Sequence, residues 1–79
     1  MPYTKELVDE VNVLNLFHLS NNQEGIKVHA TAEQSTIDAA KRLHDKGLTT
    51  QKDGGYLTDL GIEAVEHAKA LLLILTTEH

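Results

Sequence analysis

The pattern of apolar and polar positions along the chain predicts three helices, a short strand and a β-hairpin. The first helix is expected to follow Thr4, which can cap it, and to continue to Leu19, before the polar run that starts at Ser20. Between residues 13 and 19 the apolar positions almost surround the helix, which predicts a central place in the fold. Its main apolar stripe is predicted to be Leu7, Val8, Val11 and Leu14.

A short strand and the start of a second helix are predicted next. Residues 26–30 alternate apolar and polar positions and include two β-branched side chains, as half-buried strands do. Thr31 is a candidate N-cap, and Gln34 stands three residues later, where it would close a capping box. The second helix is therefore expected to begin at Ala32 or Glu33.

The second helix is predicted to end at Lys46. Gly47 is expected to take a left-handed conformation after it, which lets Leu48 fold back onto Leu43 or a neighbour. The inward face is predicted to hold Thr36, Ile37, Ala40 and Leu43, and the outward face Ser35, Asp38, Arg42 and Asp45.

A hairpin and a third helix complete the predicted elements. Two β-prone segments, 48–51 and 56–58, flank residues 52–55, whose Asp-Gly-Gly sequence supplies the positive φ that hairpin turns need. Thr58 or Asp59 is then expected to cap the last helix. The inward face of this helix is predicted to comprise Leu60, Ala64, Val65, Ala68, Leu71, Leu72 and Leu75.

Composition narrows the class of protein. The chain has 79 residues, 41% of them hydrophobic, which fits one small domain over residues 1–79 with an aliphatic core. It contains no cysteine, which excludes disulfides and thiolate metal sites and favours a cytoplasmic location. The longest apolar run, Ala70–Leu75, is far shorter than the roughly 20 residues that span a bilayer. The first residues lack the pattern of a signal peptide, so none is expected.

Part of the sequence resembles winged-helix proteins. The resemblance lies in residues 42–49, 53–58 and Gly61, where a Lys-Gly-Leu stop leads into a wing and a Leu-Thr cap leads into a last helix. It implies an α+β fold: a small winged-helix-like domain of three helices with a short antiparallel β-hairpin, to which residues 26–29 can add a third strand. The chain departs from that pattern between Leu19 and Thr31, because a helix-turn-helix joins its helices by a turn of about three or four residues. Either the first helix acts as the scaffold across a long connection, or the tri-helical core is incomplete.

The whole chain also resembles a small family of uncharacterised bacterial proteins of similar length. The matching stretches are 14–17, 23–29, 42–48 and 53–58. Some members are labelled DNA-binding or transcriptional-regulator proteins, and the resemblance implies no established activity.

The charge distribution bears on DNA binding. The chain has a net charge of −5, and the surplus negative charge lies in its terminal segments, whereas residues 20–58 are balanced. DNA-binding surfaces are normally basic because they neutralise phosphates, so double-stranded DNA is a possible partner only for the middle segment. The candidate contacts are Ser35, Lys41, Arg42, Lys46 and Lys52. The alternative is a solvated face with Asp38–Arg42 and Lys41–Asp45 ion pairs.

No catalytic, cofactor or metal site is predicted. The only serines, Ser20 and Ser35, stand at capping or exposed positions, and the chain lacks a cysteine nucleophile. Glu63 and His67 are spaced so that they could hold a metal or share a hydrogen bond, but the histidines show no ligand spacing. We therefore expect a protein that is not an enzyme and has no small-molecule substrate.

The last helix is the candidate association surface. Six consecutive apolar residues cannot all face one small core, which predicts a homodimer formed through Leu71, Leu72, Leu73, Ile74 and Leu75. The alternative is that the first helix and the sheet cover both sides of this helix. The expected function is a non-enzymatic regulatory or adaptor module associated with DNA. The alternative function is a protein-interaction module, a homodimer or one that titrates a partner, without DNA contact.

Overall fold

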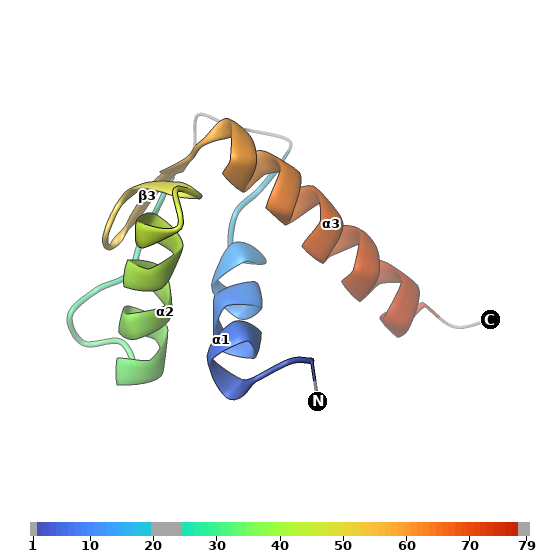
Figure 1. The fold of residues 1–79 in the computed structure, drawn as a ribbon, viewed down its shortest axis with the longest axis horizontal. Helices are drawn as coiled ribbons and strands as arrows, with labels where there is room; N and C mark the ends of the chain where they lie inside the picture. The colour runs from blue at the N-terminus through green and yellow to red at the C-terminus, as the bar shows by residue number, and fades with distance from the viewer. Residues whose placement is uncertain (1, 20–24, 78–79) are drawn as a thin grey trace.

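The computed structural model describes residues 2–19 and 25–77. Over these residues the element order is α1 (Lys5–Leu14), β1 (Ile26–Lys27), α2 (Gln34–Asp45), β2 (Thr49–Gln51), β3 (Gly54–Leu57) and α3 (Asp59–Thr76) (Figure 1). The predicted α+β fold is confirmed, and so is the third strand, since the antiparallel sheet has the order β1-β3-β2. Helices α1 and α2 lie side by side, the sheet lies at the end of α2, and α3 diverges from α1 (Figure 1).

Helix α1 begins as predicted and ends early. The Thr4 hydroxyl accepts a hydrogen bond from the Leu7 amide at 3.2 Å, as an N-cap does. The helix ends at Leu14, and the prediction that it continues to Leu19 is wrong. The chain tightens after Leu14 because the Leu16 and Phe17 amides bond three residues back instead of four, Phe17 N–H to Leu14 O at 3.2 Å. This turn carries Phe17 into the core, where it is 1% exposed.

The buried face of α1 differs from the predicted stripe. Val13 and Leu14 are buried, whereas Leu7 and Val8 are exposed. The third buried residue is an acid, Glu10. The buried residues differ from the predicted stripe because all of them lie in the second half of α1, which is the half that packs against α2.

Helix α2 starts later than expected, and the predicted capping box is wrong. The N-cap is Glu33, which makes no side-chain cap hydrogen bond within the described part of the chain. The chain turns just before it, where the Ala32 amide donates to His29 O at 2.9 Å. The Gln34 amide group that the box required donates instead to Asp38 Oδ1 at 2.8 Å. The buried residues of α2 are Ala39, Ala40 and Leu43, while Thr36 and Ile37 are half-buried.

The end of α2 is confirmed in detail. Gly47 has φ 83°, in the left-handed region. Its amide donates to His44 O at 3.0 Å, and the Leu48 amide donates to Leu43 O at 3.0 Å. These two hydrogen bonds form a Schellman motif, which turns Leu48 back so that it packs against the core around Leu43.

The hairpin forms where it was predicted, with a tighter turn. Strands β2 and β3 are joined by Lys52 and Asp53 alone, and both following glycines belong to β3. Their φ values are 117° for Gly54 and 70° for Gly55, and the register shifts between Thr49 and Gln51. A β-carbon at Gly54 would lie 2.7 Å from Ile26 O, so the close approach of β1 requires glycine there.

The core lies between α1, α2 and the first half of α3. Its buried members are Val13, Leu14, Phe17, Ala39, Leu43 and Val65, with Leu19, Ile26, Leu48, Leu57 and Ala64 packed around them.

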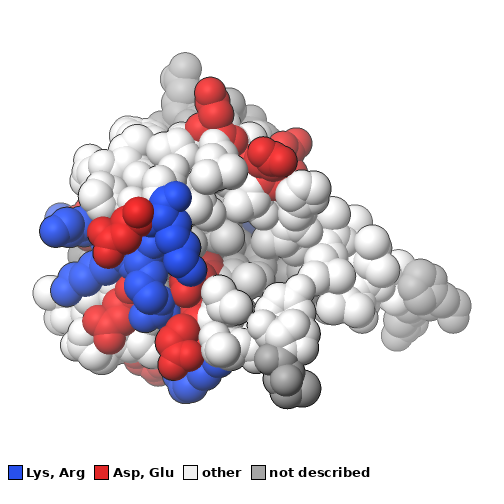
Figure 2. All heavy atoms as spheres, viewed as in Figure 1, with Lys and Arg blue, Asp and Glu red and all other residues white. Residues whose placement is uncertain are grey.

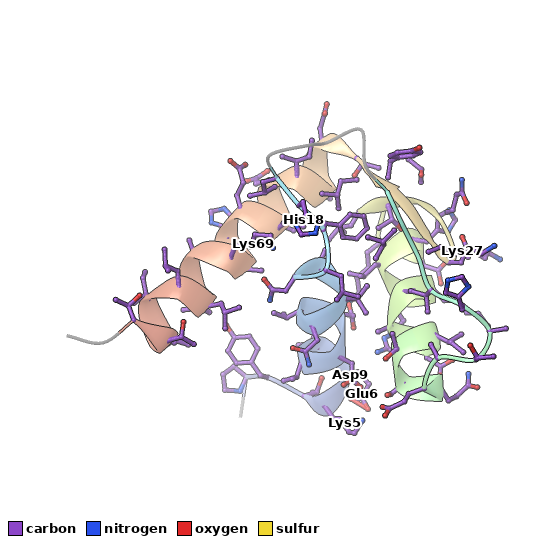
Figure 3. All side chains as sticks on the ribbon, turned by 180° about the vertical axis from the view of Figure 1, so that it is seen from behind. Lys5, Glu6, Asp9, His18, Lys27 and Lys69 are labelled. Carbon is purple, nitrogen blue, oxygen red and sulfur yellow. The ribbon has the colours of Figure 1, made fainter. Side chains whose placement is uncertain are left out.

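Helix α3 is anchored from its N-cap to Lys69, and residues 70–76 are exposed. Thr58 is the predicted N-cap: its hydroxyl accepts from the Gly61 amide at 3.1 Å and donates to Gly47 O at 2.6 Å. Lys69 Nζ donates to Asn15 O at 3.1 Å, which ties α3 to the end of α1 (Figure 3). Buried residues of α3 are limited to Gly61 and Val65. Among the described residues, no helix has the length and apolar character needed to cross a membrane.

Candidate interaction surfaces

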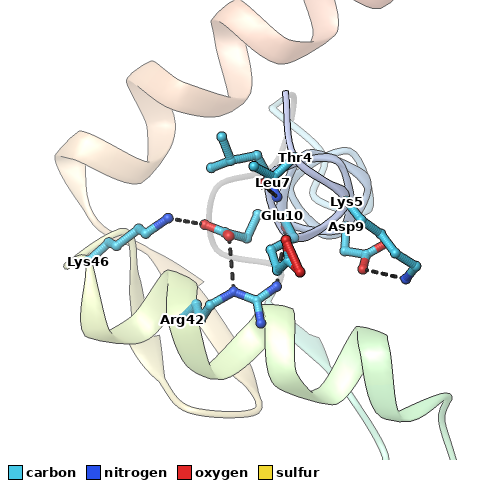
Figure 4. Close-up of polar contacts among 8 residues, drawn as sticks. Thr4, Lys5, Leu7, Asp9, Glu10, Arg42 and Lys46 are labelled. Atoms are coloured by element: carbon cyan, nitrogen blue, oxygen red, sulfur yellow. Dashed lines mark hydrogen bonds and ion pairs between the residues drawn. The ribbon is translucent and has the colours of Figure 1, made fainter. Parts of the chain in front are cut away.

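A buried carboxylate joins α1 to the last two turns of α2 (Figure 4). Glu10 is 4% exposed, and its Oε2 accepts from Arg42 Nε at 3.0 Å. Its Oε1 accepts from Lys46 Nζ. The Arg42 guanidinium also donates through Nη2 to the backbone oxygen of Glu6 at 3.2 Å. Two of the five predicted DNA contacts are thus held by one acid of the neighbouring helix.

The electrostatics of this cluster favour the ionised acid. Burial alone would raise the pKa of Glu10, but the hydrogen bonds and positive charges of Lys46 and Arg42 outweigh it, and the pKa lies below its usual value. The charge of Glu10 therefore stabilises the packing of α1 on α2. To contact a phosphate, Arg42 or Lys46 would have to break its ion pair with Glu10 or bind the phosphate and the Glu10 carboxylate together.

The predicted ion pairs along α2 do not form within the described residues. Arg42 pairs with Glu10 rather than with Asp38, and Lys41 makes no ion pair with Asp45. Glu10 itself was missed. Its sequence signal was its spacing, since it stands three and four residues before Val13 and Leu14 and therefore shares their helix face.

The other predicted DNA contacts lie apart from the Glu10 cluster. Lys41 and Lys52 are exposed and line one hollow of about 300 Å³ between α2 and the hairpin, beside Asp53. Ser35 is half-buried and lines a separate hollow of about 260 Å³ against α1, near Asp9. Basic and acidic side chains alternate over the face of α1 and α2, so that face presents no uniformly basic surface (Figure 2).

The last turns of α3, after Lys69, project away from the core as an apolar arm. We call residues 71–75 the leucine arm. The alternative in which α1 and the sheet cover both sides of the helix is wrong. The predicted inward positions of Leu60, Leu71, Leu72 and Leu75 are also wrong, because all four side chains are exposed. The arm shows no charged side chain in Figure 2. The exposed fractions are 46% for Leu71, 48% for Leu72, 67% for Leu73, 62% for Ile74 and 72% for Leu75.

An apolar groove lies between α1 and α3, beside the leucine arm. Its volume is about 400 Å³. Leu71 belongs both to the groove and to the arm, so the two apolar surfaces are continuous. The sequence alone did not predict the groove, because it exists only where α3 diverges from α1. The apolar side chains that line it include Tyr3, Val8, Val11, Leu14, Ala68 and Leu71.

Of the candidate metal ligands, Glu63 and His67 lie near each other on α3. Glu63 Oε1 and His67 Nε2 are 4.0 Å apart, and both side chains are largely exposed. Over residues 2–19 and 25–77, no three His, Asp or Glu side chains lie close enough together to hold a metal ion. The pair therefore reads as a surface contact on α3.

Comparison with known proteins identifies the family of the chain, and that family has no assigned activity. The family model DUF5669, described as a family of unknown function, matches residues 1–76. The expected resemblance to a small uncharacterised family is confirmed to that extent. Neither a curated protein nor a solved structure matches the chain.

Proposed function

We propose that this chain, which belongs to the family of unknown function DUF5669, is a protein-interaction module that acts as a homodimer through α3. The observation that carries this proposal is the exposure of five consecutive apolar residues, Leu71–Leu75, at the end of a helix that is packed only as far as Lys69. A contiguous exposed apolar surface of this kind usually marks a contact site.

The magnitude of the burial supports association. The exposed fractions of the leucine arm together equal about three fully exposed side chains, and burying them contributes roughly 4–9 kcal/mol per chain. A two-fold pair that fully buries two arms gains roughly 8–18 kcal/mol, which is comparable with the roughly 4–15 kcal/mol that association costs in lost freedom. We therefore expect a dimer at tens of micromolar protein.

The charge distribution along α3 is compatible with such a pair despite the net charge of −5. Residues 70–77 carry no charge, while Glu63 and Glu66 lie in the first half of the helix. In a two-fold arrangement centred on the arms, these acids lie toward the rim, where water screens their repulsion.

Sedimentation velocity between about 5 and 500 µM tests the proposal, at concentrations that bracket a dissociation constant of tens of micromolar. The wild type should sediment as a dimer, and a double variant of the arm, Leu73→Gln with Ile74→Gln, as a monomer with an unchanged circular dichroism spectrum. The matched control is Leu16→Gln with Leu60→Gln, since both of these residues are 53% exposed and lie outside the arm. A wild type that stays monomeric throughout this range refutes the proposal.

DNA association is the second candidate function, and Lys41 with Lys52 favours it. Both lysines are exposed, share one hollow and have no ion-pair partner among the described residues. The resemblance to winged-helix proteins and to bacterial proteins labelled DNA-binding points the same way. On this proposal the module regulates transcription in the cytoplasm, with Ser35, Arg42 and Lys46 as further contacts.

A salt-dependent titration on mixed-sequence duplex tests DNA association. The variant Lys41→Ala with Lys52→Ala should weaken binding on all sequences and lower the salt slope by about two, because two phosphate contacts are lost. Lys5→Ala is the matched control, since Lys5 is exposed and lies on α1. Affinity that is equal in the double variant and the wild type removes the hollow from the interface. Arg42→Ala with Lys46→Ala is a poorer test, because it also leaves the buried Glu10 carboxylate without its two ion-pair partners and so destabilises the fold.

A further inference from the structure

The groove between α1 and α3 is an apolar surface that nothing in residues 2–19 and 25–77 covers. One wall exposes Tyr3, just before α1, at 58% and Val8, on α1, at 44%. Its other wall is formed by α3, up to Leu71. Seven of the eleven large apolar side chains that are exposed over the described residues belong either to this groove or to the leucine arm. Most of the exposed large apolar side chains therefore lie in one region of the molecule.

We propose that this groove receives the leucine arm of a second copy, so that two chains exchange arms reciprocally. The inference rests on the proposed homodimer and adds its geometry. A two-fold interface requires each surface patch to meet its complement on the other chain, and here each chain carries one arm and one groove. Because Leu71 belongs to both, the two contacts adjoin at the symmetry axis and form one continuous interface.

The size of the interface favours exchange over a simple pair of helices lying side by side. Stable interfaces bury about 800 Å² on each partner. The arm supplies only five exposed apolar side chains, and a side-by-side pair would leave Tyr3 and Val8 in water. Exchange covers the arm and the groove together, and so brings all seven exposed side chains into contact.

The chemistry of the two surfaces is also matched. The arm contains only leucine and isoleucine, and the groove is lined mainly by apolar side chains, with Asn12 and His67 as its polar members. Among the residues that the structure describes, no acidic side chain lines the groove. Inserting the arm of the negatively charged second copy therefore leaves no carboxylate buried without a partner.

Substitution at Val8 tests the exchange, since a side-by-side pair does not use α1. Val8→Gln should raise the dimer dissociation constant at least tenfold, because each dimer contains two grooves. Leu7→Gln is the matched control, since Leu7 is the adjacent exposed residue and does not line the groove. Its dissociation constant should stay within about twofold of the wild type.

Disulfide trapping gives the second measurement, because the chain has no cysteine of its own. Chains carrying Val8→Cys are mixed with chains carrying Ile74→Cys under mild oxidation, and the yield of mixed disulfide is compared with that from Leu7→Cys and Ile74→Cys. Exchange predicts a clear excess for Val8. A wild type that dimerises while Val8→Gln has no effect and no excess disulfide forms overturns the exchange and leaves the homodimer standing. A wild type that never dimerises overturns both.

Discussion

Replacing Glu10 by Gln should destabilise the fold by about 2–3 kcal/mol at pH 7. The substitution keeps the shape of the side chain and removes the charge that Arg42 and Lys46 hold. Hydrogen bonds to charged groups contribute roughly 1.5–3 kcal/mol each. The expected sum is smaller than two full bonds, because the side chains of Arg42 and Lys46 are 33% and 48% exposed and water screens them. For a domain of this size, each kcal/mol corresponds to roughly 4–8 °C in Tm.

The effect of Glu10→Gln should depend on pH with a definite sign. The pKa of Glu10 in the folded protein lies below its ordinary value of 4.5, so the unfolded chain binds the proton more readily. The stabilisation by Glu10 is therefore complete above pH 4.5 and is lost as the pH falls through the lower, folded value. Urea unfolding of wild type and variant at pH 7, 5 and 3 should give curves that differ fully at pH 7 and approach each other at pH 3.

Glu66→Gln is the control for this measurement, because Glu66 is an exposed acid on α3. Its effect should stay within about 0.5 kcal/mol at every pH, as for most surface substitutions. If Glu10→Gln were no more destabilising than this control at pH 7, or if its full effect persisted at pH 3, the charge of Glu10 would not hold α1 on α2.

Three further substitutions test the helix ends by urea unfolding. Gly47→Val should cost on the order of 1–2 kcal/mol, since its φ of 83° is unfavourable for β-branched residues; wild-type stability would contradict the Schellman motif. Gly61→Ala should cost about 1–3 kcal/mol, because its β-carbon would lie 2.0 Å from Leu48 O; an unchanged midpoint would mean that α3 is not seated so closely. Thr58→Ala should cost about 1–2 kcal/mol through loss of the N-cap, whereas Thr58→Ser should retain most of the stability.

The features that the sequence predicted well are those decided by local chemistry. The stop at Gly47 depends on six consecutive residues, and the cap at Thr58 depends on four, so neither requires knowledge of the rest of the fold. The hairpin around Asp53 was predicted for the same reason. Its glycines lie in β3 rather than in the turn because β1 approaches Gly54 closely, which is a tertiary effect.

The features that the sequence did not predict depend on how helices meet. The burial of Glu10 follows from the approach of Arg42 and Lys46 on α2, and an acid at that position otherwise suggests a solvated surface. The early end of α1 follows from the place of Phe17 in the core. Periodicity alone also could not distinguish an inward face of α3 from an exposed one, because the last two turns are apolar on every side.

The edges of the sheet affect how the protein resists aggregation. β1 and β2 are the two edge strands, and they are two and three residues long. An incoming strand would find few free backbone groups to pair with, so the sheet is a poor template for fibril growth or for capture of an extended peptide. The protein can therefore expose a hydrophobic helix without also exposing a long strand edge, which keeps its self-recognition separate from the strand pairing that leads to amyloid.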